Sequence, residues 1–365
     1  MSDSCPRSIV VFLPNWVGDV VMATPTLRAL RNCFADSHIT YFGRSVALDT
    51  LGGTDWADDV IEAAVKIRSR TLGQLQLVGA LRAGRFDLAV LLTNSFRTAF
   101  LAKLAGIGRI AGYDRDARRF LLTDRISPPR DDSGKLVPIS AVDYYAELAG
   151  LIGVEVSDRE MYLPLTDTHE QIAEELFEQA GIDQDRPVVM LNPGASGGTS
   201  KIWGPDQFAR TADMLIESRG AQIVINAAPP EKPVAADVAR RMEGTPAINF
   251  ADRDNTLGLL KSMLKRTDVL VTNDTGARHI AVAVGSAVVT VFGSTDPLWA
   301  RINCPRERIV SVEVDCGPCG RKLCNQIPGP IYHHCMGKVT PEMVVEATGQ
   351  LLDELLAKSE GGPGR

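Results

Sequence analysis

The chain has 365 residues and a formal net charge of −6 at pH 7, and its 45% hydrophobic content is that of a soluble globular protein. This length exceeds one ordinary hydrophobic core and predicts two domains. The acidic balance disfavours a nucleic-acid-binding protein, because affinity for phosphate backbones comes mostly from Lys and Arg. No stretch approaches the roughly 20 apolar residues of a membrane-spanning helix, and no secretory leader is visible, so a cytoplasmic protein is expected.

In the first half of the chain, short β-rich runs alternate with helical patterns. Apolar residues recur at three- and four-residue spacing from Val20 to Phe34 and predict a helix between the first two runs. Strands that alternate with helices predict a parallel sheet covered on both faces. The predicted strands are Ser8–Leu13, His38–Phe42, Phe86–Leu92 and Arg109–Ala111.

The alternation breaks near Ser127–Val137, continues with a helix near Asp143–Ile152 and an irregular stretch, and then starts again. Two successive α/β units predict two Rossmann-like domains, residues 1–165 and 166–340. Residues 341–365 are expected to form a C-terminal helix, which packs back on the first domain, and a flexible tail. The strands predicted in the second domain are Pro187–Leu191, Gln222–Asn226, Ala247–Phe250, Asp268–Thr272 and Ala287–Phe292.

The first predicted strand runs into a loop that contains Asn15, Gly18 and Asp19, directly before a helix. In open α/β sheets, ligands bind outside the carboxyl ends of the strands. A carboxylate at Asp19 could therefore act as a general base toward a hydroxyl group. Asp also favours helix N-caps, so a purely structural role for Asp19 stays open.

Three arginines, Arg115, Arg118 and Arg119, lie within five residues of one loop. Arginines grouped in this way can hold phosphate or carboxylate in bidentate fashion. Charge runs are more often solvated surface loops, and the residues alone favour that interpretation.

The loop from Asn192 to Trp203 offers hydroxyls, backbone N–H groups and Lys201, a mixture that can cradle a diphosphate. It is not a Walker A loop, because Ile202 stands where that motif has the Ser or Thr that holds magnesium. The run from Gly194 to Gly198 also matches the nucleophile elbow of α/β-hydrolases, with Ser196 as nucleophile. That motif needs a helix immediately after the serine, whereas here a loop continues to Pro205, so a hydrolase is kept only as an alternative.

A second small-residue turn follows a strand at Asn273-Asp274-Thr275-Gly276. The helix that it opens would present N–H groups to a phosphate or ribose, and His279 lies one turn inside it. The alternatives are an N-cap role for Asp274 and a structural role for His279. Glu231 follows a neighbouring strand and could accept hydrogen bonds from ribose hydroxyls. No Gly-x-Gly-x-x-Gly follows the first strand of either domain, which disfavours a nicotinamide dehydrogenase.

The C-terminal region holds four cysteines within twenty residues, Cys316, Cys319, Cys324 and Cys335. Four thiolates can bind zinc tetrahedrally in a structural site. The spacing is irregular for a zinc ribbon, so a reduced cluster without metal is the alternative.

These motifs, in this order, resemble the heptosyltransferases, an inverting family of GT-B glycosyltransferases. The resemblance spans most of the chain and rests on the segments Asn15–Asp19, Gly112-Tyr113 with Arg118–Thr123, Asn192–Ala195 with Lys201–Trp203, Asn273–Gly276 with His279–Ala281, and Phe292–Pro297. It implies transfer of heptose from an ADP-activated donor to the inner core of lipopolysaccharide, without a catalytic cofactor and without nucleic acid. A peripheral contact with the cytoplasmic face of the inner membrane is compatible with that role.

By motif position, the resemblance makes Asp19 the catalytic base and Lys201 the phosphate partner. Asn15 and the three arginines of the loop would bind the acceptor. The donor would contact Ser196, Gly197, Lys201, Glu231, Asp274, Thr275, Gly276 and His279. The sequence departs from many members at Arg278, where a hydrophobic residue is usual. Two alternatives stay open: a relative that transfers another sugar to another surface glycan, and a non-catalytic module that binds sugar nucleotides.

Overall fold

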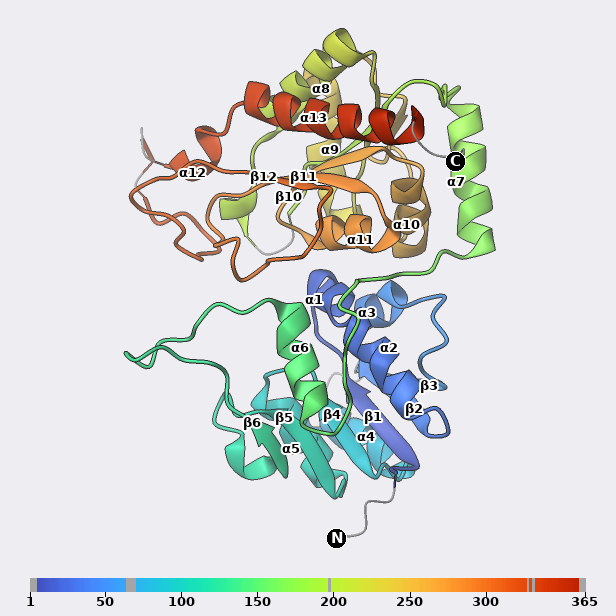
Figure 1. The fold of residues 1–365 in the computed structure, drawn as a ribbon, viewed down its shortest axis with the longest axis vertical. Helices are drawn as coiled ribbons and strands as arrows, with labels where there is room; N and C mark the ends of the chain where they lie inside the picture. The colour runs from blue at the N-terminus through green and yellow to red at the C-terminus, as the bar shows by residue number, and fades with distance from the viewer. Residues whose placement is uncertain (1–4, 64–69, 196–197, 327, 330–331, 361–365) are drawn as a thin grey trace. The chain divides into compact units, whose positions relative to one another are not determined.

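The computed structural model describes residues 5–63, 70–195, 198–326, 328–329 and 332–360. The chain divides into two compact units, Met1–Leu163 and Pro164–Arg365. Each unit contains a six-stranded parallel sheet with its own helices (Figure 1). The predicted α/β fold with two Rossmann-like domains is confirmed.

The sheet of the first unit has the strand order β3-β2-β1-β4-β5-β6. The central strands are buried along almost their whole length, and β4 is a run of four buried apolar residues. Such runs are expected of parallel strands that helices cover on both faces. The strands are β1 Ser8–Phe12, β2 His38–Gly43, β3 Asp59–Glu62, β4 Leu88–Leu91, β5 Arg109–Tyr113 and β6 Asp124–Ile126.

The helices of the first unit form two groups. Helices α4 (Arg70–Ala83) and α5 (Phe96–Leu104) pack together and share a core with side chains of β1 and β4. In the other group, α1 (Val17–Met22) and α2 (Thr24–Cys33) contact α6 (Ala141–Gly150) (Figure 1). The single helix predicted between the first strands is thus two helices. They separate at Ala23, and Pro25 lies in the first turn of α2, where its missing N–H costs nothing.

The sheet of the second unit has the order β12-β11-β10-β7-β8-β9, all parallel. Its strands are β7 Val188–Asn192, β8 Gln222–Ile225, β9 Ile248–Asn249, β10 Val269–Asn273, β11 Ala287–Val291 and β12 Glu307–Val310. Its main helices are α7 Asp167–Gln179, α8 Pro205–Arg219, α9 Lys232–Arg241, α10 Leu257–Lys265, α11 Gly276–Val284 and α13 Pro341–Glu360.

The C-terminal helix α13 belongs to the second unit. It packs against α8 and against β10, β11 and β12 (Figure 1), and its predicted packing on the first domain stays a prediction. Its buried side chains Val344, Leu351 and Leu352 explain the packing, because they form an apolar stripe on one side of the helix.

The two sheets share one topology. Counted from its own first strand, each sheet has the Rossmann order 3-2-1-4-5-6. The order reverses between β1 and β4 in the first unit and between β7 and β10 in the second. Ligands of open α/β sheets bind at this switch point, outside the carboxyl ends of the strands. The topology therefore points to one candidate site in each unit.

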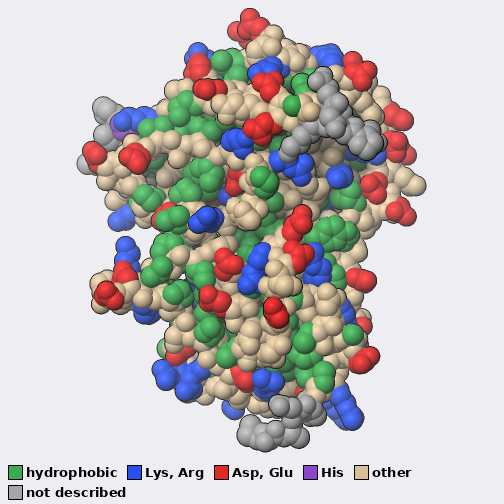
Figure 2. All heavy atoms as spheres, viewed as in Figure 1, with side chains coloured by type: hydrophobic (Ala, Val, Ile, Leu, Met, Phe, Trp, Pro, Cys, Tyr) green, Lys and Arg blue, Asp and Glu red, His purple; other side chains and the backbone are tan. Residues whose placement is uncertain are grey.

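The surface is of mixed charge on the face that Figure 2 shows, where Lys and Arg are interspersed with Asp and Glu. In the described parts of the chain, no helix is long and apolar enough to cross a membrane.

Candidate donor and catalytic sites

Asp19 lies in the first turn of α1, just beyond the carboxyl end of β1, and is half-buried. Trp16, not Asp19, occupies the N-cap position, and no side chain caps this helix. Burial, with a smaller contribution from the charge of Asp19, raises the pKa of the Tyr145 phenol on α6. The structure thus removes the N-cap explanation for Asp19 and leaves its carboxylate at the switch point of the first sheet.

Arg118 is an interior residue, with no exposed surface. Its guanidinium donates to the carbonyl oxygens of Thr93 at 2.5 Å and Tyr113 at 2.9 Å, and to the Asn94 amide oxygen at 3.3 Å. Burial lowers its pKa to about 10, which still leaves it charged at neutral pH. These hydrogen bonds tie the loop after β4 to the end of β5, and a contact of Arg118 with the acceptor stays a prediction.

The other predicted acceptor residues are more accessible. Arg119 is exposed and pairs with Asp114 at 3.3 Å, and the Arg115 side chain hydrogen-bonds the Tyr144 hydroxyl. Asn15 is exposed in the loop after β1 and lines a cavity of about 200 Å³. The three arginines therefore do not act as one group, because one is internal and the other two already have protein partners.

In the second unit, buried asparagines hold the carboxyl edge of the sheet. Asn192 of β7 donates to the Thr272 hydroxyl at 3.0 Å and accepts from Asn226 at 2.7 Å. Asn273 of β10 donates to the carbonyl oxygens of Pro193 and Gly194 at 2.9 and 3.2 Å. These amides fix the loop after β7 against β10. Sequence reasoning missed their role, although asparagine at the end of three apolar runs of the second unit was a visible signal.

Lys201 and Asp274 form the central ion pair of this edge. The Lys201 ammonium lies 2.7 Å from the Asp274 carboxylate, and the two side chains are 29% and 9% exposed. Burial alone would raise the pKa of Asp274, but the charge and the hydrogen bond of Lys201 outweigh it, aided by the charge of Arg278, and hold the pKa below its ordinary value. The loop after β7 and the turn after β10, predicted as two halves of one site, are therefore in direct contact.

The surroundings of Arg278 give a physical reason for an arginine at a position where a hydrophobic residue was expected. It is fully buried, binds both oxygens of Glu307 at 2.5 and 2.9 Å, and lies over the Phe292 ring. It also approaches Asp274 at 3.8 Å. Its charge is thus balanced inside the protein by β12, a strand that sequence analysis did not predict.

His279 lies on α11 and is almost completely buried. Burial, with a contribution from Arg278, lowers its pKa to about 3, so its imidazole is neutral. Nδ1 is buried and has no hydrogen-bond partner among the described residues. Thr275 is the N-cap residue of α11 and Gly276 its first residue, so Asp274 is not the cap. The start of this helix directs N–H groups toward the same edge as Lys201.

Glu231 lies against the loop after β7. A Cβ atom added to Gly194 would come within 2.2–2.5 Å of the Glu231 carboxyl group, so only glycine allows this approach. Burial raises the pKa of Glu231, and the backbone N–H of Ala228 partly offsets the effect. Glu231 and Lys201 thus belong to one edge, as predicted. Ser196 and Gly197, predicted in the same loop, lie outside the described residues.

The cysteine-rich segment packs on this loop. Ser200 donates to the Arg321 carbonyl oxygen at 2.5 Å, and a Cβ atom on Gly198 would meet the Lys322 oxygen. A small cavity of about 20 Å³ is lined by all four cysteines, together with His333. In the described part of the chain, however, no group of three or more His, Cys, Asp or Glu is arranged so that it could hold a metal ion. Zinc at Cys316, Cys319, Cys324 and Cys335 therefore stays a prediction.

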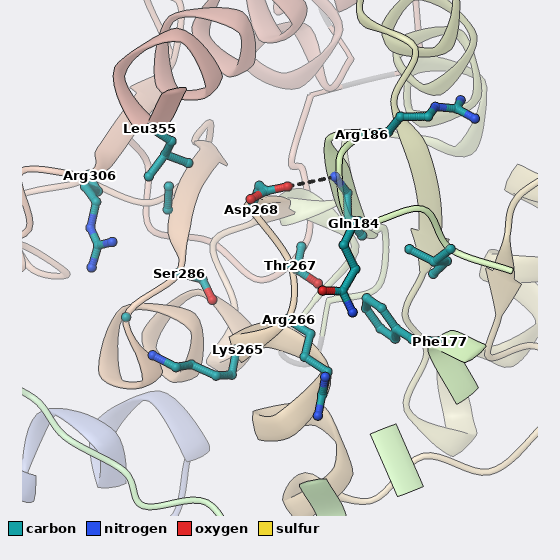
Figure 3. Close-up of a pocket in the computed structure, with 14 residues that line it drawn as sticks. Phe177, Gln184, Arg186, Lys265, Arg266, Thr267, Asp268, Ser286, Arg306 and Leu355 are labelled. Carbon is teal, nitrogen blue, oxygen red and sulfur yellow. Dashed lines mark hydrogen bonds between the residues drawn. The ribbon is translucent and has the colours of Figure 1, made fainter. Parts of the chain in front are cut away.

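A further cavity of the second unit, of about 310 Å³, lies at the amino ends of β7, β10 and β11 (Figure 3). Lys265, Arg266 and Asp268 line it, and the Asp268 carboxylate accepts a hydrogen bond from the N–H of Val188 at 2.9 Å. This edge is opposite to the one that holds Lys201 and Asp274, so the cavity is separate from the candidate donor site.

Two units, each with a parallel sheet of Rossmann order, are the architecture of the GT-B fold. The structure is similar to that of a family 9 glycosyltransferase from Veillonella parvula, with a TM-score of 0.78 at 23% identity over 95% of this chain and 97% of that one. It is also similar to ADP-heptose lps heptosyltransferase II of E. coli, with a TM-score of 0.74 at 21% identity over 95% and 99% of the two chains.

The family model for glycosyltransferase family 9 (heptosyltransferase) matches residues 74–328, more than half of the sequence, and the chain belongs to that family. Among curated proteins, lipooligosaccharide heptosyltransferase 2 of Haemophilus influenzae is 27% identical over 360 residues, which cover 96% of this chain and 100% of that protein. The predicted resemblance is confirmed.

Proposed function

We propose that this enzyme transfers a heptose from ADP-heptose to the inner core of lipopolysaccharide and inverts the anomeric centre, with Asp19 as the general base. The Lys201–Asp274 pair at the switch point of the second sheet is the observation that carries the proposal, because it joins both predicted phosphate-binding segments. The names of the relatives support the choice of donor and acceptor, and the similarity to them runs over nearly the whole chain.

On the donor side, Lys201 is the cation that meets the diphosphate. An ammonium group has three donors, so Lys201 can keep Asp274 as one partner and bind a phosphate oxygen with another. N–H groups at the start of α11, near Thr275 and Gly276, add fixed positive potential. Glu231 lies on the same edge and is placed to accept from ribose hydroxyls. These groups of the chain itself stabilise the leaving ADP.

The transfer is a single displacement. A hydroxyl oxygen of the acceptor attacks the anomeric carbon while the bond from that carbon to the diphosphate oxygen breaks, and the electron pair leaves with ADP. The hydroxyl proton passes to the Asp19 carboxylate. General-base catalysis of this kind typically contributes a factor of about 10²–10⁴.

We further propose that the acceptor is met at the cytoplasmic face of the inner membrane. This location follows from a lipid-linked acceptor and an ADP-activated donor, and it needs only peripheral contact. Sedimentation with vesicles that contain heptose-deficient lipopolysaccharide tests it, since protein that stays in the supernatant at every lipid concentration would contradict the contact.

Thermal stabilisation by a panel of nucleotide sugars tests the donor. ADP-heptose should raise the melting temperature of the wild type more than ADP-glucose, UDP-glucose or GDP-mannose, because only a ligand that binds the native state stabilises it. Lys201→Ala should lose most of that shift. A larger shift with another nucleotide sugar would assign a different donor, and no shift with any of them would remove the donor site.

A further inference from the structure

The second unit holds a cavity of about 310 Å³ at the amino ends of its strands (Figure 3), and the proposed reaction makes no use of it. The loop after α7, the ends of α10 and α11, the segment before β12 and the helix α13 all contribute to its wall. Pockets for small organic ligands begin at roughly 300 Å³. The cavity therefore accommodates a molecule larger than an inorganic ion.

Among the described residues that line the cavity, the charged side chains are mostly cationic. Asp268 is the one carboxylate. The four cations are Arg186, Lys265, Arg266 and Arg306. Arg266 pairs with Glu174 at 3.5 Å. Arg186 donates to the carbonyl oxygen of Gly220 at 2.7 Å. The lining thus has an excess of positive charge, and two of its cations have no such partner.

Lys265 and Arg306 are these two cations. Within the described ranges of the chain, neither of them forms an ion pair or donates a side-chain hydrogen bond. Glu307, next to Arg306 in the sequence, does not serve as its counter-ion, because both carboxylate oxygens bind Arg278. The donors of both cationic side chains are therefore available to a ligand.

The two cationic groups lie over one turn. A Cβ atom added to Gly285 would lie 3.6 Å from Nη2 of Arg306 and 3.9 Å from Nζ of Lys265. In Figure 3 both side chains extend toward this turn, which directly precedes Ser286. Gly285 is the C-cap of α11 with a φ of 89°, a conformation that favours glycine. No side chain of this residue therefore stands between the two cations.

Helix dipoles explain the sign of these charges but not their arrangement. Helices α10 and α11 both end at this edge of the sheet, and cations are favoured near helix C-termini. That preference does not require two cations to converge on one turn. Neither cation donates to a carbonyl oxygen in the described part of the chain, so the helix ends leave their hydrogen-bonding capacity unused.

Much of the remaining wall is apolar. Phe177 of α7 is buried, and Ile182 and Leu355 are half-buried. An apolar wall with a few convergent polar groups is the usual form of a small-molecule site. The combination fits an organic anion whose apolar part lies against these side chains.

We propose that this cavity binds a small phosphate monoester, with the phosphate group at Lys265 and Arg306 and the organic part against Phe177 and Leu355. A phosphate monoester carries a charge of about −1.5 to −2 at pH 7, which matches two cations, whereas a carboxylate would balance only one. Arg binds phosphate in bidentate fashion and Lys binds it as a point charge, and the site joins one of each. The site is separate from the donor site and does not depend on the proposed function.

Calorimetric titration with phenyl phosphate tests the proposal, because this probe carries a phosphate monoester on an apolar ring. The wild type should bind it, and the double variant Lys265→Gln, Arg306→Gln should bind it at least about ten times more weakly, the loss of about one charge-assisted hydrogen bond. Lys265→Arg keeps the charge and should bind nearly as the wild type does. The matched control is the double variant Arg253→Gln, Lys338→Gln, which removes two exposed cations of the same unit outside the cavity and should not change binding.

The proposed donor site is the other place where a phosphate group is expected to bind. Lys201→Ala should therefore bind phenyl phosphate as tightly as the wild type does. Binding that disappears in Lys201→Ala and persists in the double variant of Lys265 and Arg306 would overturn the proposal, as would a wild type that binds no phenyl phosphate at millimolar concentration. The titration needs no turnover, so its result is independent of the assigned reaction.

Two other probes test the class of ligand. Inorganic phosphate lacks the apolar part and benzoate lacks the second charge, so the wild type should bind both more weakly than phenyl phosphate. Equal affinity for inorganic phosphate would remove the role of the apolar wall, and equal affinity for benzoate would remove the match to two cations. Lys265 is exposed and Arg306 half-buried, so the fold should tolerate both substitutions, and the melting temperature of each variant without ligand checks this.

Discussion

Replacing Lys201 by an uncharged residue should leave the Asp274 carboxylate buried and without its main cationic partner. Asp274 is only 9% exposed, and its remaining cation, Arg278, lies 3.8 Å away and is already bound to Glu307. We therefore predict that Lys201→Met destabilises the second unit, and that adding Asp274→Asn restores part of the loss, since it removes the charge that lost its partner.

The size of the effect follows from the geometry. Two unit charges 2.7 Å apart attract by about 6 kcal/mol at an effective dielectric constant of about 20 and by about 1.5 kcal/mol in bulk water. Desolvation of Asp274 offsets much of the larger value, and charged hydrogen bonds contribute a net of about 1.5–3 kcal/mol. We expect the coupling free energy between Lys201 and Asp274 to lie in that range.

A double-mutant cycle measures this coupling, with the free energy of unfolding from urea titration of the wild type, the two single variants and the double variant. The Lys232–Asp254 pair is a matched control. It has the same 2.7 Å separation, and its lysine is also 29% exposed, but its aspartate is 90% exposed. Exposed ion pairs contribute little, so its coupling should be clearly smaller. Equal coupling in the two cycles would refute the argument that burial makes the Lys201 pair strong.

Three further outcomes are expected. Arg118→Met should lower the free energy of unfolding by about 3 kcal/mol or more, because it leaves buried carbonyl oxygens without donors. Arg119→Ala should change the free energy of unfolding by less than about 0.5 kcal/mol. Similar values for the two variants would contradict the interior role of Arg118. His279 has a pKa of about 3 in the folded state and about 6.5 in the unfolded state, so the unfolded state binds more protons between these pH values and the free energy of unfolding falls as pH decreases. From pH 7 to pH 5, the wild type should lose about 2 kcal/mol more of its free energy of unfolding than His279→Gln does. Identical losses in the two proteins would exclude His279 as the cause of this pH dependence. If the four cysteines bind zinc, protein purified under reducing conditions should contain one zinc per chain by elemental analysis, and replacing Cys319 by Ser should remove it; a metal-free wild type after refolding with zinc present would end that prediction.

The sequence predicted the strands that lie in the middle of each sheet and one edge strand, β9, but missed the other three edge strands. The β1 and β10 strands are continuous apolar runs because helices cover both of their faces. The missed strands β3, β6 and β12 are three or four residues long and partly exposed. Their composition reflects solvent on one side, so apolar patterning carries little signal for them.

The sequence likewise located some of the candidate site residues but not the surroundings of others. Asp19, Lys201 and Asp274 follow strand ends in the chain, and the topology brings strand ends together, so local sequence was sufficient to find them. Arg118 could not be separated from its neighbours Arg115 and Arg119, because burial depends on a turn that directs one side chain inward. Arg44 and Arg97 are more than fifty residues apart in the sequence, and only the strand order places both beside the cavity that Asn15 lines.

Mass spectrometry of the acceptor tests the central claim most directly. Heptose-deficient lipopolysaccharide core is incubated with ADP-heptose and either the wild-type protein or Asp19→Asn. The wild type should add the mass of one heptose with release of an equal amount of ADP, and Asp19→Asn should do so at least about a hundred times more slowly while it binds ADP-heptose as tightly. Core of unchanged mass with the wild type, or an Asp19→Asn variant that keeps more than about a tenth of the rate, would contradict the account.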